Sequence, residues 1–294
     1  MLIASVPSLT PKRRNVVTAS IVLSTVGLSK TYKQRRWFVR DNRDVAAAAE
    51  VSIEIRRGET VGIVGESGSG KSTVARCIAR LIEPSSGRIV IGDTDFASIS
   101  RVQLRALRRK VQIVFQDPYR SLNPRRTVGE AIIEGPMNYG ATREQALACA
   151  RNLMDLVRMD PTAIDRYPHQ FSGGQRQRIC IARSLAMEPD LLIADEAVSA
   201  LDVSVQAQVL ALLDEIRKRL DLAMLFITHD LRVAAQVCDR VAVMAHGRVV
   251  EYGPVTDVFT NPQDPYTKAL VAAAPGRSWN FAAGVPIRSG VNVG

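Results

Sequence analysis

The sequence has no apolar run long enough to cross a bilayer, because charged residues, Gly or Pro interrupt every run well short of that length. It also lacks a good secretory leader. Lys12-Arg13-Arg14 precedes the partly apolar stretch 16–28, but hydroxyl residues interrupt this stretch and no small-residue cleavage site follows it. We therefore expect a soluble body that reaches a membrane only through partners, with residues 1–20 as a loose tail before a first strand near 21–28.

Paired cysteines and concentrated charge are lacking too. The cysteines lie too far apart for a zinc site or a redox dithiol, and we interpret them as buried, reduced thiols of a cytosolic protein: Cys77, Cys149, Cys180 and Cys238. The net charge is +10, yet the basic residues form no long run. Charge alone therefore does not indicate a nucleic acid or an anionic membrane surface as the partner.

What the sequence does contain is an alternation of short apolar runs with longer helical patterns, which predicts an α/β protein with a largely parallel sheet. The predicted strands are 60–64, 111–115, 191–194 and 223–228. Each leads directly into a polar feature, and these are a Gly-rich loop, Gln116, the pair Asp195-Glu196, and His229. Because open α/β sheets bind ligands at the carboxyl ends of their strands, we expect these features to form a site.

Residues 117–171 have a helical pattern, and Thr142 with Gln145 predicts a capping box at the start of one helix. The apolar residues of that helix share one face at helical spacing, as expected for core packing: Ala146, Leu147, Ala150, Leu153, Met154 and Val157. Another helix is predicted over 205–217. The stretch after Pro275 has little periodicity, and we expect it to be a tail.

The Gly-rich loop fits the phosphate-loop pattern G-x-x-x-x-G-K-[ST], with a predicted strand before it and a predicted helix over 72–81 after it. A flexible Gly/Ser turn would not need this context. The loop consists of Gly65, Glu66, Ser67, Gly68, Ser69, Gly70, Lys71, Ser72 and Thr73. Its backbone N–H groups and the helix N-terminus would surround phosphates. We expect Lys71 to reach the β- and γ-phosphates of a nucleoside triphosphate and the Ser72 hydroxyl to ligate Mg²⁺.

The acidic pair Asp195-Glu196 ends an apolar strand, the arrangement that brings one acid to Mg²⁺ and leaves the next for a water molecule. We expect Asp195 to bind the metal and Glu196 to orient or deprotonate the attacking water. Two acids at a strand end are commonly solvated loop charges. The phosphate loop in the same chain is what favours the catalytic interpretation.

A second glycine motif, Phe171-Ser172-Gly173-Gly174-Gln175, precedes a predicted helix over 176–185. A hydroxyl and two glycines at a helix N-terminus can form a second anion cradle, although alone they could be a linker turn. With its motifs in this order, the chain resembles the ATP-binding cassette (ABC) ATPases, whose signature SGGQ stands at Ser172 to Gln175. In that family two cassettes pack head to tail, and the signature of one closes the phosphate loop of the other.

The remaining matches are implied by the resemblance alone. Tyr32 matches the aromatic residue that stacks on adenine, but a core tyrosine is the alternative, and Trp37 and Phe38 could compete for the base. Three further positions match the glutamine that senses Mg²⁺ and water, the loop that crosses the dimer interface, and the histidine that contacts the γ-phosphate: Gln116, Ser199-Ala200-Leu201-Asp202 and His229.

Three finer runs resemble the dipeptide/oligopeptide-type importers of bacteria, and they span residues 117–125, 196–204 and 261–270. The resemblance covers about residues 21–275 and implies ATP-driven uptake of peptides, or of nickel or glutathione. It implies a second ABC ATPase subunit, identical or not, and two permeases, contacted through the segment after Gln116. An extracytoplasmic substrate-binding protein would be an indirect partner. The chain would work peripherally at the cytoplasmic face of the bacterial inner membrane, without nucleic acid.

The resemblance also implies a fold, that of an ABC-type P-loop NTPase. Its parts would be a RecA-like parallel sheet core, an antiparallel β subdomain, a helical subdomain at about 117–171 and a short C-terminal extension. The ATPase domain would span 21–255, and the oligopeptide-transporter-type extension and tail would span 256–294. Relatives often carry a cysteine-rich stretch that can hold an iron–sulfur cluster, but no cysteine follows Cys238. We therefore expect no cluster.

Two other classes of protein would also use some of these motifs. A soluble ABC ATPase acting on nucleic acid or on the ribosome would suit the positive charge. However, the sequence has neither the long coiled-coil insertion of the DNA-repair relatives nor the second cassette of the ribosome-acting ones. A phosphate-loop kinase or GTPase would have no use for Ser172 to Gln175. Of these interpretations, the ATPase of a transporter is the one that accounts for every motif.

Overall fold

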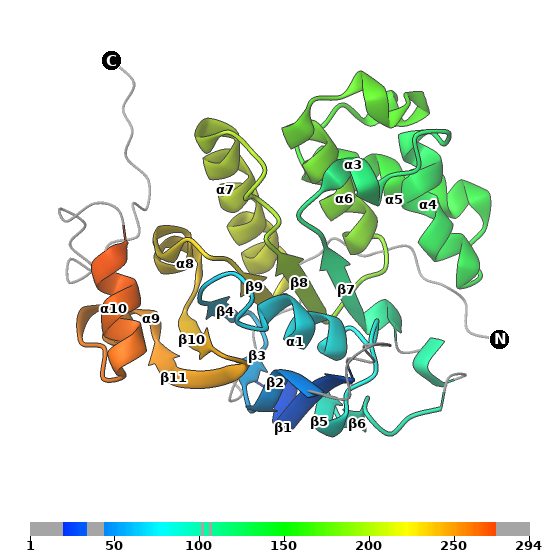
Figure 1. The fold of residues 1–294 in the computed structure, drawn as a ribbon. Coiled ribbons are helices and arrows are strands. Elements are labelled where there is room, and N and C mark those ends of the chain that lie inside the picture. Colours follow the sequence, from blue (N-terminus) through cyan, green and yellow to red (C-terminus); the bar gives the residue numbers. More distant parts are fainter. Residues whose placement is uncertain (1–19, 34–43, 101–102, 106–107, 275–294) are drawn as a thin grey trace, which may run out of the picture. The chain divides into compact units, whose positions relative to one another are not determined.

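The structure is a computed structural model, and it describes residues 20–33, 44–100, 103–105 and 108–274. The chain forms two compact units (Figure 1). We call Ser100–Met224 the helical unit, and Ile21–Ile99 together with Leu225–Gly294 the sheet unit. Among the residues that the structure describes, no helix is both long and apolar enough to span a membrane.

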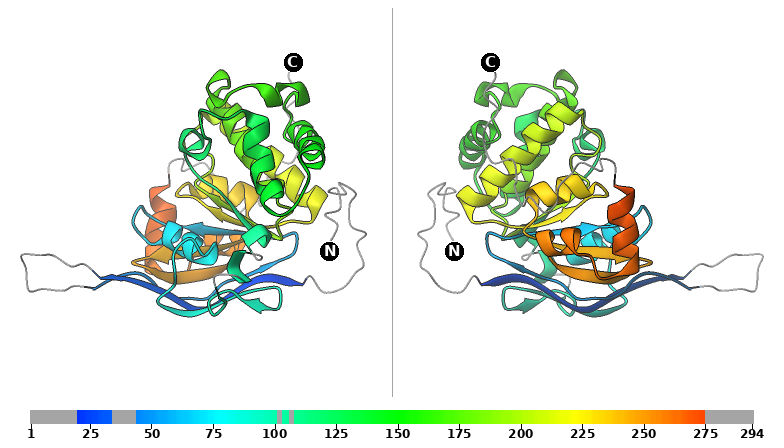
Figure 2. Two further views of the ribbon diagram at one scale, coloured as in Figure 1. Left: turned by 90° about the vertical axis from the view of Figure 1, so that its right-hand side faces the viewer. Right: turned by 90° about the vertical axis from the view of Figure 1, so that its left-hand side faces the viewer.

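The sheet unit contains an antiparallel sheet built around one long strand, β1 (Ile21–Lys33). Strand β1 pairs with β2 (Asp44–Val51), β3 (Glu54–Arg56) and β5 (Ser86–Ile91), and β5 pairs with β6 (Thr94–Asp95). Figure 2 shows β1 and β2 as one long, bent ribbon. The apolar side chains Leu23 and Leu28 are fully buried and set the inner face of the sheet. The strand predicted near 21–28 is therefore confirmed and extends further.

The sheet unit also contains parallel strands, which carry the phosphate loop. Strand β4 (Thr60–Val64) pairs in parallel with β10 (Arg240–Ala245), β9 (Ala223–Ile227) follows β4 in the strand order, and β11 (Arg248–Pro254) returns antiparallel to β10. Every residue of β4 is buried, as expected for a strand covered on both faces.

Four helices lie in the part of the sheet unit that the structure describes. They are α1 (Lys71–Ile78), α8 (Leu231–Val237), α9 (Val255–Thr260) and α10 (Pro265–Ala273). The helix predicted over 72–81 is α1, but α1 ends earlier, because Arg80 takes the left-handed conformation with φ 50°.

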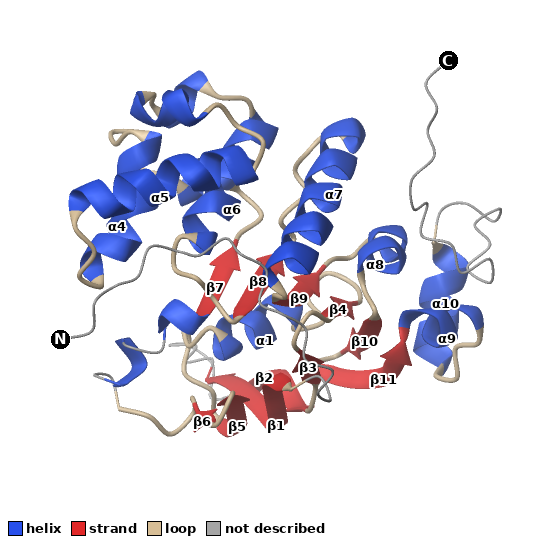
Figure 3. Ribbon diagram, turned by 180° about the vertical axis from the view of Figure 1, so that it is seen from behind, coloured by secondary structure: helices blue, strands red, loops and turns tan. Residues whose placement is uncertain are grey.

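The helical unit contains two strands, β7 (Val111–Val114) and β8 (Leu191–Asp195), which pair in parallel. Among its α-helices are α3 (Pro118–Ser121), α4 (Val128–Asn138), α5 (Arg143–Leu156), α6 (Gly173–Leu185) and α7 (Val203–Leu220). Short 3-10 turns cover Arg108–Lys110, Pro161–Asp165 and Pro168–Gln170. Figure 3 shows α4, α5 and α6 grouped together, and each contacts the other two.

Local sequence signals start these helices. Thr142 and Gln145 form the predicted capping box of α5, and Thr127 with Glu130 forms the same box at α4. The predicted apolar face of α5 is buried except for Leu147, which is partly exposed. The helix predicted over 205–217 is α7, which is longer at both ends.

All four cysteines are buried and free, as expected from the sequence. Burial raises the pKa of the Cys77, Cys149 and Cys180 thiols to about 11. These side chains are therefore protonated near neutral pH and pack as small apolar groups.

Candidate functional site

The phosphate loop between β4 and α1 depends on its glycines. Gly65 and Gly70 have φ values of 146° and 104°, which L side chains rarely adopt. They also have no room for a side chain. A Cβ atom on Gly65 would lie 2.2 Å from the Met244 carbonyl oxygen, and one on Gly70 would lie 2.1 Å from that of Ala47. Neighbouring backbone from β2 and β10 thus holds the loop at both ends.

Lys71 is the buried cation of this loop. Its ammonium donates to the carbonyl oxygens of Gly65 at 2.8 Å and Glu66 at 2.7 Å. The loop is further fixed by the Gly247 N–H, which donates to the Ser69 carbonyl at 3.0 Å. A positive charge therefore lies within a ring of backbone at the start of a helix, which is an arrangement that attracts a polyphosphate.

His229 follows the strand next to the phosphate loop. The Thr228 N–H donates to the Ile63 carbonyl at 3.2 Å, so β4 and β9 end at the same edge of the sheet unit. Asp230 then caps α8 by accepting from the Arg232 N–H at 2.9 Å. His229 therefore lies just after a strand that ends at the same edge as the strand before the phosphate loop.

Tyr32 is near the end of β1 and is 42% exposed. The Lys30 ammonium lies 5.2 Å from the centre of its ring. This exposure argues against the alternative that Tyr32 is a core residue. The two competing aromatic residues, Trp37 and Phe38, lie outside the described residues.

In the helical unit, Gln116 and the acidic pair lie at the ends of adjacent strands, and Asp195 is the last residue of β8. Val114 of β7 and Ala194 of β8 are partners in the parallel register, so both features lie at the same edge. Asp195 is buried, with 6% of its surface exposed. Glu196 has φ 50°, and its carbonyl accepts from both the N–H and the hydroxyl of Ser199 at 3.1 and 3.0 Å. This tight turn directs the chain abruptly out of the strand.

The signature begins helix α6. Ser172 accepts from the Gln175 N–H at 3.3 Å, and the Gln175 side chain accepts from the Ser172 N–H at 2.9 Å. A Cβ atom on Gly174 would lie 2.3 Å from Val205 of α7, whereas one on Gly173 would approach only Leu201, at 3.9 Å. The loop that contains Asp202 therefore packs directly beside the signature.

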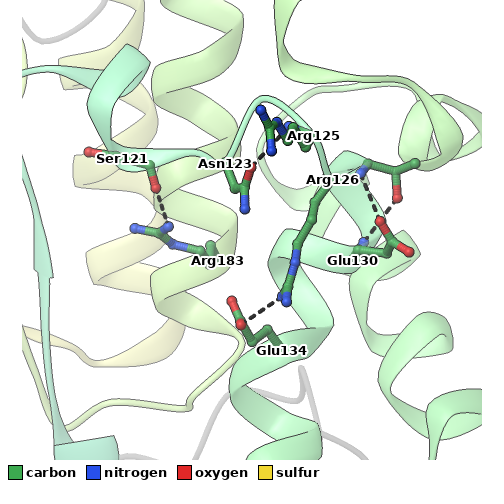
Figure 4. Close-up of polar contacts among 8 residues, drawn as sticks. Ser121, Asn123, Arg125, Arg126, Glu130, Glu134 and Arg183 are labelled. Carbon is green, nitrogen blue, oxygen red and sulfur yellow. Dashed lines mark hydrogen bonds and ion pairs between the residues drawn. The ribbon is translucent and has the colours of Figure 1, made fainter.

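Helix α6 also holds the chain on both sides of Gln116. Gln177, which is fully buried, donates to the Phe115 carbonyl at 3.3 Å. Further along the helix, the Arg183 guanidinium donates to the Ser121 carbonyl at the end of α3 (Figure 4). The Arg176 guanidinium stacks on the Tyr119 ring at 3.9 Å. The signature helix is thus joined to the segment around Gln116 by side chains spaced over about two turns.

The segment after Gln116 has its own internal bonds. Asp117 caps α3 by accepting from the Tyr119 N–H at 2.8 Å. Asn123 accepts from the Arg125 N–H at 3.0 Å, and Arg126 pairs with Glu134 at 2.7 Å (Figure 4). The Tyr119 side chain is 63% exposed, so this ordered segment presents an aromatic group to solvent.

The structure thus gathers the expected residues in two sets. The sheet unit carries Tyr32, Gly65–Thr73 and His229, and the helical unit carries Gln116, Ser172–Gln175, Asp195, Glu196 and Asp202. Gln177, Arg183 and the capping box within the signature were not expected from the sequence. The spacing Ser-x-x-Gln would have indicated the box, whereas a contact between residues 62 positions apart has no local signal.

Comparisons with known proteins show which family this chain is similar to. A family model described as ABC transporter matches residues 48–199, and one described as oligopeptide/dipeptide transporter, C-terminal region, matches residues 250–280. The solved structure of cbiO1 from Clostridium perfringens, part of an ABC transporter complex, has a TM-score of 0.72 and 31% identity, covering 82% of this chain and 91% of that one. The solved structure of a dimeric ATP-binding cassette bound to ADP and Pi has a TM-score of 0.68 and 29% identity. This match covers 79% of this chain and 98% of that one.

Curated relatives are more similar in sequence. A putative peptide import ATP-binding protein of Brucella ovis is 48% identical over 260 residues, which cover 88% of this chain and 80% of the relative. The glutathione import ATP-binding protein GsiA of Escherichia coli O6:H1 is 46% identical over 266 residues, covering 90% of this chain and 43% of that protein. The chain therefore belongs to the ABC transporter family of ATP-binding proteins, and to its oligopeptide/dipeptide type.

Proposed function

We propose that this chain energises a bacterial importer of di- or oligopeptides, or of a related cargo such as glutathione or nickel. The observation that carries this proposal is the match of residues 250–280 to the oligopeptide/dipeptide C-terminal region. The names of the relatives support the class of cargo, since they describe peptide import and glutathione import. No residue that we assign to the site would touch the cargo, so its choice would rest with the permeases and an extracytoplasmic binding protein.

In the proposed site, the loop from Gly65 to Thr73 binds the phosphates of ATP. The backbone N–H groups at the start of α1 face anions, and the Lys71 ammonium adds a charge that is already desolvated. Tyr32 would stack on the adenine, which suits its exposed ring. His229 would contact the γ-phosphate from the neighbouring strand.

The residues also fit a magnesium ion. Ser72, Gln116 and Asp195 offer hydroxyl, amide and carboxylate oxygens, the ligand atoms that Mg²⁺ prefers. The ion would neutralise charge on the phosphates during transfer to water. Gln116 and Asp195 lie at the ends of adjacent parallel strands, which supports a shared role for them.

Glu196 would accept the proton of the attacking water, or orient that water, beside Asp195. Its φ of 50° turns the chain sharply at this point. In a closed pair of subunits, Ser172–Gln175 of one chain would face the γ-phosphate bound by the other. Ser172 already accepts from the Gln175 N–H, so its own hydroxyl hydrogen can be donated outward to an anion. Asp202, on the adjoining loop, would lie at the same interface.

The partners would be a second ATPase subunit, identical or related, and two membrane permeases. We propose the segment from Asp117 to Arg126 as the contact for a permease, because it combines internal order with the exposed ring of Tyr119. The chain would then be a peripheral protein at the cytoplasmic face of the bacterial inner membrane. Closure of the subunits around ATP would drive alternating access of the permeases, and hydrolysis would reset it.

Replacing Glu196 with Gln tests the proposal. We expect the variant, assembled with its permeases, to bind ATP normally, to lose nearly all hydrolysis and to accumulate as a closed dimer. Glu188→Gln is a matched control, since Glu188 is another glutamate with positive φ, 51°, in the same unit. Normal ATP hydrolysis by Glu196→Gln would disprove the role of Glu196 in activating water.

A further inference from the structure

A tyrosine of the C-terminal region contacts the phosphate loop. The hydroxyl of Tyr266, in helix α10, accepts a hydrogen bond from the Glu66 N–H at 3.1 Å. The two residues are 200 positions apart in the chain, yet both belong to the sheet unit. Glu66 is the second residue of the loop, and its carbonyl oxygen accepts from the Lys71 ammonium at 2.7 Å. Tyr266 and Lys71 thus fix the N–H and the carbonyl of the same residue.

The start of helix α10, which carries Tyr266, is itself held in place by hydrogen bonds. Asp264 caps α10 by accepting from the Tyr266 N–H at 2.8 Å and the Thr267 N–H at 3.4 Å. The Glu251 carboxylate, in β11, accepts from the N–H groups of Gln263 at 2.9 Å and Asp264 at 3.1 Å. Thr267 is fully buried beneath the first turn of the helix. The start of α10 is therefore fastened to the sheet, and it carries the tyrosine with it.

The contact lies on the loop rather than on a nucleotide. The phosphate-facing groups of such loops are backbone N–H groups that point inward near the start of the following helix. Glu66 lies at the base of the loop, where the chain leaves β4. A bond at the base restricts the orientations available to the following residues, and a cradle that is ordered beforehand loses less entropy when a ligand binds.

We propose that Tyr266 is a positioning residue for nucleotide binding, through which the C-terminal region holds the phosphate loop in its binding conformation. This inference rests on the proposed role of Gly65–Thr73 in binding ATP. Tyr266 acts through Glu66 and needs no contact with the nucleotide. The C-terminal region would then contribute to ATP affinity.

The test compares two tyrosines that lose the same atom. Tyr266→Phe removes only the hydroxyl that accepts from Glu66. Tyr252→Phe is the matched control, because the Tyr252 hydroxyl also bonds to backbone in the sheet unit, donating to the Glu54 carbonyl at 2.8 Å and accepting from its N–H at 3.2 Å. Binding of ATP to each full-length variant is measured by titration, and kcat and KM are measured after assembly with the permeases.

We expect Tyr266→Phe to raise the Kd and KM for ATP by about 2- to 10-fold, the usual effect of one hydrogen bond, with kcat close to that of the unchanged protein. Tyr252→Phe should leave Kd and KM unchanged even where it lowers the melting temperature. The inference is overturned if Tyr266→Phe binds ATP normally, or if both variants lose affinity equally.

Lys71→Ala, measured in parallel, separates the two proposals. If Lys71→Ala abolishes ATP binding while Tyr266→Phe has no effect, the positioning role alone is wrong. If Lys71→Ala binds ATP as well as the unchanged chain, the assignment of the phosphate loop is wrong, and the role of Tyr266 is wrong with it.

Discussion

The side-chain amide of Gln177 donates a hydrogen bond to the carbonyl of Phe115, 3.3 Å away, from a helix position with no exposed surface. Phe115 directly precedes Gln116, and Gln177 lies in the helix that the signature begins. One buried amide thus connects the segment of Gln116, for which we propose a role in sensing Mg²⁺ and water, with the helix of the signature, which we propose faces the γ-phosphate. This connection runs through a single side chain, so it can be tested by substitution.

We predict that Gln177→Leu lowers the free energy of unfolding by about 1 kcal/mol, because the Phe115 carbonyl loses its donor while the volume is preserved. Gln112→Leu is the control. The Gln112 amide also donates to a backbone carbonyl, that of Arg108 at 2.9 Å, but at an exposed position, so we expect a change within about 0.5 kcal/mol. Urea unfolding measures both, and equal effects would show that burial of the bond is unimportant.

We expect a Gly→Ala substitution to lower the free energy of unfolding by different amounts at two glycines of the phosphate loop. Gly68 and Gly70 both have positive φ, 83° and 104°, but a Cβ atom on Gly68 meets nothing within 4 Å. Gly68→Ala should therefore cost only the backbone strain, about 1–2 kcal/mol. Gly70→Ala adds the clash with the Ala47 carbonyl and should cost about 3 kcal/mol or more. Thermal unfolding of both variants checks the order, and a smaller cost for Gly70→Ala would contradict the loop geometry.

The signature is expected to be crowded at one glycine only. Gly174→Ala would press a methyl group into Val205, so we predict a loss of about 1–3 kcal/mol in the free energy of unfolding. Adding Val205→Ala should restore most of that loss, since it removes the atom that lies 2.3 Å from the new methyl group. Gly173→Ala should have little effect on folding. A double-mutant cycle that shows no coupling between the two positions would contradict the packing of α6 against α7.

The attachment of α10 should depend on pH. Burial alone would raise the pKa of Glu251, but hydrogen bonds from Gln263, Thr267 and Asp264 outweigh it and hold the pKa below the ordinary 4.5. A lowered pKa in the folded state stabilises the protein above pH 4.5, and this contribution is lost as the pH falls through the folded value. The unchanged protein should thus be more stable than Glu251→Gln at pH 7, and the difference should disappear in acid. A difference that stays constant with pH would exclude the charge as its cause.

Much of the fold could be predicted from the sequence, because local patterns determine it. The strand predicted over 60–64 coincides with β4, and the Thr142–Gln145 capping box forms as predicted. The strands predicted to end at 115 and 228 each stop one residue earlier. Helix α1 ends at Ile78 because Arg80 takes the left-handed conformation, and no residue in this part of the sequence indicates that conformation.

The roles of the site residues were predicted from motifs and remain predictions. The structure adds how these residues are supported, which the sequence could not reveal. Gln177 reaches Phe115 across 62 positions, and Tyr266 reaches Glu66 across 200. Such contacts follow from how the strands and helices pack, and they leave no periodicity in the sequence. The supports of a site are therefore harder to predict than the residues that bind its ligand.

The burial of all four cysteines makes the chain convenient for labelling. Exposed thiolates are the nucleophiles that attack maleimide reagents, so the buried native thiols can stay in place while a new, exposed cysteine is introduced. Val203 is 84% exposed and directly follows Asp202. A spin label attached to Val203→Cys would report the separation of two subunits directly, in a chain that is otherwise unaltered.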